Sequence, residues 1–200
     1  MRLRKVFLRN MVFWSFIAVL LVASVFFTYR AELTRHKLVK ARLTKSISDN
    51  TTVTVVAVID GDEIKVKSAT SKGFVVRILG IKAYSANRME RQISTFGKRA
   101  MSELQLLVGK EVNLRFSKFQ KDSRERVLAY VELDGEDIGK KLIFSGWAIV
   151  YELYPFERMT SYLVAEREAL TKRRGLWGNE KARERSLALK GAWEAMKSDV

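Results

Sequence analysis

The side chains able to do chemistry in this 200-residue sequence are carboxylates, arginines and lysines. There is no cysteine and one histidine, His36, which we expect to be a surface residue. Thiolate nucleophiles, disulfides, Cys/His zinc sites and most catalytic triads are thereby excluded. Asp60 and Asp62 flank a glycine, and Arg77 and Arg126 follow. The composition therefore leaves open a site made of carboxylates, arginines and an oxygen-bound metal.

The net charge of +15 is divided unevenly along the chain. Residues 1–50 contain ten Lys or Arg and two acids, whereas residues 51–200 contain 27 and 20. The first quarter thus carries about half of the positive excess. The moderate excess in the remainder is only weak support for a nucleic-acid surface.

The elements that must position these residues begin near residue 52. Alternating β-branched residues predict five short strands, over residues 53–60, 61–68, 74–81, 111–116 and 126–133. Asp60-Gly61 predicts a hairpin turn, in which Gly61 would supply a positive φ. Apolar residues at helical spacing predict helices within 96–108, 138–143 and 159–170. This order favours an α+β fold, a five-stranded OB-type barrel with about three helices over residues 52–178.

The segment before the barrel predicts a membrane anchor. Residues 1–9 form a basic tail, and residues 10–29 are twenty uncharged residues, enough for a transmembrane helix across a hydrocarbon core. A cleaved signal peptide is the alternative, although the apolar run is longer than a usual signal core. The basic, acid-free start suits a bacterial or mitochondrial inner membrane, and the flanking charges do not settle on which side the domain lies.

Two further segments flank the predicted barrel. Residues 30–51 form a basic juxtamembrane segment, either a helix on a membrane surface or partner or a solvated stalk. Residues 179–200 form a charged helical extension that includes Trp193. We expect Trp193 to pack on its own domain, with another subunit as the alternative.

Six short strings occur in the order typical of the thermonuclease, or staphylococcal nuclease-like, family, and the sequence resembles that family over residues 52–178. The strings are VIDGD (58–62), VVRILGI (75–81), FG (96–97), RVLAY (126–130), GWA (146–148) and RGLWG (174–178). The resemblance implies an OB-type barrel with three helices. In active members it also implies calcium-dependent cleavage of DNA or RNA phosphodiesters, with Asp62, Arg77 and Arg126 at the matching site positions.

One site motif of the resembled family, of the Asp-Thr-Pro-Glu type, is replaced. Where it should stand the sequence reads Lys82, Ala83, Tyr84 and Ser85. Lys82 replaces the metal-binding aspartate, and Ser85 replaces the glutamate that would activate water. An ammonium group and a calcium ion do not suit the same place. We therefore expect Lys82 to pair with Asp62, and no metal to bind unless other acids rescue the site.

Two nearby acids could rescue activity. Glu63 follows Asp62, and strand alternation predicts that it points to the opposite face. Glu90 lies in a polar insertion whose path the sequence does not define. Without such a rescue, Arg77 and Arg126 are expected to be structural arginines, paired with Asp62, Asp122 or Glu125.

Three functions remain, and the first is favoured. The first is a membrane-anchored, catalytically inactive thermonuclease-like protein that binds protein partners as an accessory or scaffolding subunit of a membrane assembly. The second is a calcium-dependent nuclease tethered to the bilayer. The third is non-catalytic nucleic-acid binding through the two arginines and three basic residues, Lys118, Lys121 and Arg124.

Overall fold

The chain is described by a computed structural model. It covers residues 51–69, 71–86, 91–117, 121–122 and 126–198, and eight residues between 20 and 30. Contacts divide the chain into two units, Met1–Ser48 and Asp49–Val200. In the first unit the eight described residues are helical. Most of the predicted span 10–29, the basic tail, His36 and residues 31–50 lie outside the described residues. No helix in the described part of the chain is long and apolar enough to cross a bilayer.

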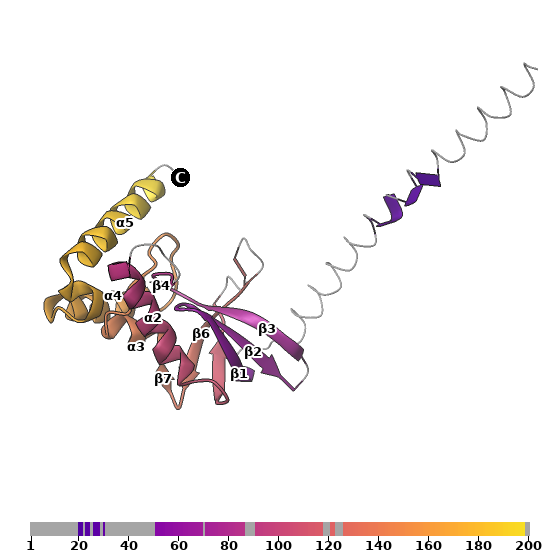
Figure 1. The fold of residues 1–200 in the computed structure, drawn as a ribbon, viewed down its shortest axis with the longest axis horizontal. Helices are drawn as coiled ribbons and strands as arrows, with labels where there is room; N and C mark the ends of the chain where they lie inside the picture. Colours follow the sequence, from indigo (N-terminus) through magenta and orange to yellow (C-terminus); the bar gives the residue numbers. More distant parts are fainter. Residues whose placement is uncertain are drawn as a thin grey trace, which may run out of the picture. The chain divides into compact units, whose positions relative to one another are not determined.

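The second unit contains a closed barrel of five main strands (Figure 1). Their sheet order is β3-β2-β1-β5-β6, and a parallel pairing of β3 with β6 closes the ring. The five predicted strands are confirmed, as β1 (Thr51–Asp60), β2 (Glu63–Ser68), β3 (Ser71–Ile78), β5 (Glu111–Arg115) and β6 (Val127–Leu133). The α+β class and the OB-type barrel follow from this closure.

Three very short strands were not predicted. β4 (Ile81–Ala83) and β8 (Ala148–Val150) form a separate antiparallel sheet, in which Lys82 lies opposite Ile149. β7 (Glu136–Asp137) extends the barrel sheet beside β6. Segments of two or three residues are too short to show an alternating pattern, so the sequence does not reveal them.

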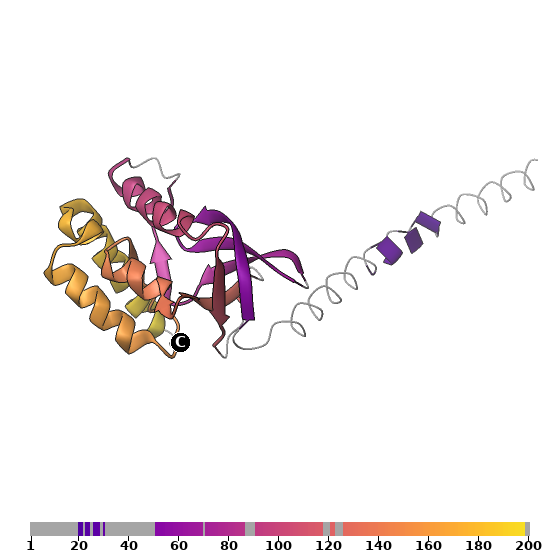
Figure 2. The same ribbon diagram turned by 90° about the horizontal axis from the view of Figure 1, so that it is seen from below.

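Helices α3, α4 and α5 gather on one side of the barrel (Figure 2). The three predicted helices are confirmed as α2 (Arg91–Gln105), α3 (Ile138–Phe144) and α4 (Met159–Thr171). A short 3₁₀ turn, η1 (Gly175–Gly178), leads into α5 (Glu180–Ser198). The side chain of Asn179 caps α5 by accepting a hydrogen bond from the amide of Ala182 (2.9 Å).

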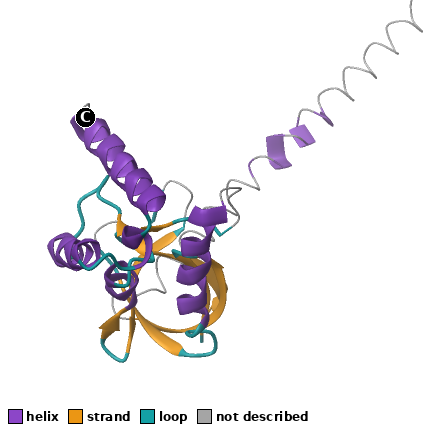
Figure 3. Cartoon of the chain, turned by 60° about the vertical axis from the view of Figure 1, so that its left-hand side comes forward, coloured by secondary structure: helices purple, strands orange, loops and turns teal. Residues whose placement is uncertain are grey.

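Helices lie beside the strands of the barrel (Figure 3). Buried side chains form a core with two parts, one inside the barrel and one between the barrel and the helices. Alternate residues of β2 and β3 fill the first, among them Ile64, Val66, Val76 and Ile78. The second includes Tyr84, Ile149, Trp177, Ala182 and Trp193. Because Trp193 is 6% exposed and packs on the ring of Tyr151, the prediction that it packs on its own domain is confirmed.

The glycine of the first hairpin is needed for a reason other than the predicted one. Gly61 is absent from the described glycines with positive φ, so the expected left-handed conformation is wrong. A Cβ atom there would lie 2.7 Å from Ala83 Cβ and 2.8 Å from Ala100 Cβ. Gly61 therefore allows the turn to pack tightly against β4 and α2, which places the neighbouring Asp62 in the interior.

Candidate functional site

Asp62 is the centre of a charged cluster at the end of the first hairpin. Its side chain is buried, and Oδ2 accepts hydrogen bonds from the Arg77 guanidinium (3.2 Å), the Lys82 ammonium (3.2 Å) and the Ala83 amide (3.3 Å). The predicted pairing of Lys82 with Asp62 is confirmed. The other carboxylate oxygen, Oδ1, has no hydrogen-bond partner in the described part of the chain.

The barrel brings these groups together through backbone pairing. The Asp62 carbonyl accepts a hydrogen bond from the amide of Ile78 (2.9 Å), which ties the hairpin turn to the strand that carries Arg77. The chain then turns at Gly80, where φ is +78°, and enters β4 with Lys82 and Ala83. Residues separated by twenty positions thus meet at one carboxylate.

Glu63 lies in the same cluster, so the prediction that it faces away from Asp62 is wrong. It is opposite Arg77 in the β2–β3 register, and its carboxylate lies 3.5 Å from the Arg77 guanidinium and also bonds to Arg126. Alternation counted from Asp62 fails because Asp62 belongs to the turn, and β2 begins at Glu63. Cross-strand neighbours share a face, so the register with Arg77 decides the direction of Glu63.

Arg126 completes the cluster at the start of β6. Its guanidinium bonds to Asp122 (Nε to Oδ2, 2.7 Å) and to Glu63, and its amide donates to Asp122 Oδ1 (3.0 Å). Arg77 thus pairs with Asp62 and Arg126 with Asp122, two of the three partners that the sequence predicted for these arginines. Four residues named in the sequence predictions, Glu90, Lys118, Arg124 and Glu125, lie outside the described residues.

In the described part of the chain, the charges of the cluster balance one another. Three carboxylates, of Asp62, Glu63 and Asp122, face three cations, of Arg77, Lys82 and Arg126. Calcium takes six to eight oxygen ligands, whereas Asp62 Oδ2 is already bound by an ammonium and a guanidinium. Within the described ranges, no group of three or more His, Asp or Glu residues could hold a metal. The donors present therefore do not fit calcium.

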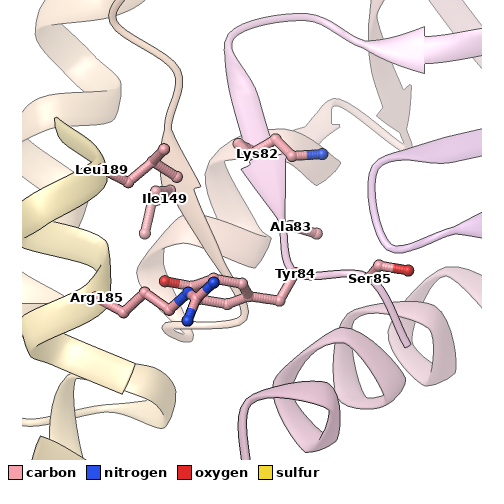
Figure 4. A pocket seen from close by; sticks show the side chains of 7 residues that line it. All are labelled: Lys82, Ala83, Tyr84, Ser85, Ile149, Arg185 and Leu189. Carbon is pink, nitrogen blue, oxygen red and sulfur yellow. The ribbon is translucent and has the colours of Figure 1, made fainter. Parts of the chain in front are cut away.

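The two residues after Ala83 line a small cleft of about 150 Å³ between β4 and α5 (Figure 4). Tyr84 extends toward α5 and lies beside Arg185, while the Lys82 ammonium points to the other side. The Tyr84 hydroxyl forms a buried hydrogen bond with the Ser186 hydroxyl (2.8 Å). Ser85 also lies on the cleft wall.

Sequence reasoning missed the aromatic side of the site. The ring of Tyr151, just after β8, lies 6.0 Å from the Arg77 guanidinium carbon and 4.8 Å from the Trp193 ring. Burial raises the pKa of the Tyr151 phenol. The helical spacing of Ala182, Leu189 and Trp193 in the sequence indicated an apolar stripe on α5. It gave no sign that this stripe packs behind the charged cluster.

A closed five-stranded barrel with a carboxylate–arginine cluster at the end of its first hairpin defines an OB-type domain of nuclease-like construction. The sequence model of the family described as "Staphylococcal nuclease homologue" matches residues 75–179, just over half of the chain. The chain belongs to this family. The match includes Arg77, Lys82 and Arg126, whereas Asp62 precedes it and α5 follows it.

The chain is also similar to a bacterial protein. It is 28% identical over 131 residues to a protein of Haemophilus influenzae described as an uncharacterized endonuclease. The similarity covers 66% of this chain and 68% of the bacterial protein.

Proposed function

We propose that this chain is a non-catalytic member of the staphylococcal nuclease family that binds protein partners, as an accessory or scaffolding subunit of a membrane assembly. The observation that carries the proposal is the position of the Lys82 ammonium, 3.2 Å from Asp62 Oδ2. A fixed positive charge at the one buried carboxylate of the cluster opposes entry of a divalent cation. No cofactor is needed for this function.

The charge pairing of Glu63, the acid next to Asp62, also supports the proposal. Ser85 stands where the resemblance places a glutamate, and a serine hydroxyl is a much weaker base than a carboxylate. The Glu63 carboxylate is already engaged by two arginines, Arg77 and Arg126. Among the described residues, the cluster therefore offers neither a vacant cation site nor an unpaired glutamate that could act as a base.

The membrane part of the proposal rests on residues 10–29. The described helical residues of this segment present large apolar side chains outward, with Leu20, Leu21, Phe26 and Phe27 between 54% and 71% exposed. Such a surface suits a lipid bilayer better than water. On this basis we propose that the chain is a single-span protein of a bacterial or mitochondrial inner membrane.

A cleavage assay on the full-length chain in mild detergent tests the proposal. Single-stranded DNA, double-stranded DNA and RNA are incubated with and without calcium, alongside the Asp62→Asn variant. We expect no difference between the chain and the variant on any substrate. Calcium-dependent cleavage that disappears in Asp62→Asn would reject the non-catalytic assignment.

A second candidate is a membrane-tethered nuclease with a rearranged site. It is favoured by the description of the Haemophilus influenzae relative as an endonuclease and by the presence of Glu63 in the cluster, since Glu63 is one of the two acids that could rescue activity. For Glu63 to act as a base, its bonds to Arg77 and Arg126 would have to break. If the chain is such a nuclease, Glu63→Gln should abolish its cleavage activity. If the chain is non-catalytic, neither the wild type nor Glu63→Gln should cleave.

The third candidate, non-catalytic nucleic-acid binding, finds little support in the described cluster. Arg77 and Arg126 already bond to carboxylates in the cluster, so a phosphate group would have to displace Asp62 or Asp122. Binding through phosphates would weaken steeply as salt is raised. An RNA or DNA affinity with that salt dependence, reduced in Arg126→Gln, would favour this candidate.

A further inference from the structure

The C-terminal helix contacts the neighbours of the Asp62 cluster on the β4 side. Tyr84 directly follows Ala83, whose amide donates to Asp62, and the Tyr84 side chain is 7% exposed. The hydroxyl of Ser186 on α5 donates its one hydrogen to the carbonyl of Ala182, so the Tyr84 hydroxyl is the donor to Ser186. A buried hydrogen bond thus links α5 to Tyr84, the residue that follows β4.

The same helix contacts the β8 side of the cluster. Trp193 packs edge to face on Tyr151, and the Tyr151 ring lies beside the Arg77 guanidinium. Lys190, one turn before Trp193, forms ion pairs with Glu152 and with the buried Glu166. Tyr151 also donates its amide to the carbonyl of Gly80, just before β4 (2.9 Å).

These contacts place α5 across both strands of the small β4–β8 sheet. Ala83 pairs with Ala148 and Lys82 with Ile149, so the two strands are expected to move together. Tyr84 fixes the end of β4, and Tyr151 with Glu152 fixes the end of β8. The position of Lys82 on Asp62 therefore depends on a sheet that α5 fastens at two places.

We infer that α5 acts as an intramolecular clamp that keeps Lys82 and Ala83 on Asp62, with Tyr84 and Tyr151 as positioning residues. When α5 detaches, the β4–β8 sheet loosens and the Asp62 carboxylate becomes accessible. This inference rests on the proposed function, because the clamp maintains the closed form of the site that we propose to be non-catalytic. The clamp would regulate the site through α5, a helix that begins after residue 179, where the family match ends.

Native-state hydrogen exchange on the full-length chain in mild detergent tests the clamp without substrate or calcium. The amide of Ala83 reports on the cluster, and the amides of Ser186 and Trp193 report on α5. In the Tyr84→Phe variant, which loses the hydrogen bond to Ser186, we expect exchange at all three amides to accelerate together, by about fivefold. Leu187→Ala is the matched control, because Leu187 lies on the same helix and is 49% exposed.

A second readout is the reactivity of the Lys82 amine toward an acylating reagent, measured by peptide mass spectrometry. We expect acylation of Lys82 to accelerate by about the same factor in Tyr84→Phe and more in Trp193→Ala, with Lys172 as an exposed internal reference. If Trp193→Ala does not fold, Tyr84→Phe and Ser186→Ala carry the test. Faster exchange in α5 with unchanged exchange at Ala83 and unchanged acylation of Lys82 would overturn the clamp.

The outcome is separable from that of the proposed function. Calcium-dependent cleavage by the wild-type chain would reject the non-catalytic assignment, whatever the exchange rates. Uncoupled exchange of α5 and Ala83 would reject the clamp, even if no cleavage is found.

Discussion

The ammonium of Lys82 lies 3.2 Å from Oδ2 of Asp62, a carboxylate whose side chain is 1% exposed. Burial of a carboxylate is costly unless cations and hydrogen bonds compensate for the lost water. Lys82, Arg77 and the amide of Ala83 supply that compensation here. The lysine at this position therefore has a structural role, which explains how the cluster stays folded with its own charges paired.

The first prediction compares the two members of this pair. We expect Asp62→Ala to lower the free energy of unfolding by about 3 kcal/mol, because it leaves Lys82 and Arg77 without their shared partner. Lys82→Met should cost about 1 kcal/mol, since Lys82 is 36% exposed and Arg77 still pairs with Asp62. Urea denaturation measures both values.

The control for this comparison is Glu136→Ala, which breaks the exposed pair with Lys141. It should change stability by less than about 1 kcal/mol. Equal effects of Asp62→Ala and Glu136→Ala would contradict the structural role of the Asp62 cluster.

The second prediction concerns the packing of the hairpin turn. In Gly61→Ala the new methyl group would lie under 3 Å from Ala83 Cβ and Ala100 Cβ, so we expect a loss of about 1–3 kcal/mol. Gly191→Ala is the matched control, because a Cβ on this helical glycine meets nothing within 4 Å. That change should stabilise the chain by about 0.5–1 kcal/mol. Thermal unfolding measures the melting temperature of both variants. Melting temperatures that shift in the same direction would refute the packing argument.

Most of the fold could be predicted from the sequence because an apolar pattern that extends over five or more residues reflects which side chains are buried. Strands β1, β2, β3, β5 and β6 alternate or run apolar over five or more residues, and α2 has one apolar face. The β4–β8 sheet escaped prediction because each strand has three residues and forms only through a distant partner. Local patterns do not report such pairing.

The site was predictable in its residues and less so in its geometry. The family resemblance placed Lys82 at the position of a metal-binding aspartate near Asp62, and the opposite charges of the two residues then predicted their ion pair. The predicted direction of the Glu63 side chain was wrong because the register of β2 with β3, which pairs Glu63 with Arg77, determines that direction. Alternation counted from the turn does not. The packing of Tyr151 between Arg77 and Trp193 depends on tertiary contacts between distant segments.

The third prediction is a pH dependence with opposite signs at two glutamates. Burial raises the pKa of Glu132, but hydrogen bonds from Arg158 and Arg115 outweigh it, so the net pKa lies below the usual 4.5. Its stabilising contribution is present above pH 4.5 and is lost as the pH falls through the lower folded pKa. The stability difference between the chain and Glu132→Gln should therefore shrink in acid.

Glu166 should behave in the opposite way. Burial raises its pKa, despite the opposing effects of Lys190 and the Val150 amide. Protonation of the folded state then adds stability as the pH falls from neutral toward 4.5, and this contribution is lost as the pH rises through the folded pKa. The stability of the chain relative to Glu166→Gln should increase over that fall in pH. Parallel pH profiles for the two glutamine variants would disprove this assignment.

The fourth prediction is that the replaced motif can be restored. The triple variant Lys82→Asp, Ala83→Thr and Ser85→Glu removes the ammonium from Asp62 and places carboxylates at the two positions where the resembled family has an aspartate and a glutamate. We expect calcium to raise its melting temperature, because a ligand that binds only the folded state stabilises it. The single change Lys82→Met is the control, and calcium should not affect its melting temperature. A triple variant that folds but ignores calcium would show that the barrel no longer provides the required geometry.

The most direct test of the central claim, that Lys82 takes the place of a cation at Asp62, is a calcium titration of the wild-type chain by calorimetry. The full-length protein in mild detergent is titrated beside the triple variant, which serves as the positive control. We predict no saturable binding heat for the wild type and saturable binding for the triple variant. Saturable calcium binding by the wild type that disappears in Asp62→Asn would contradict the claim.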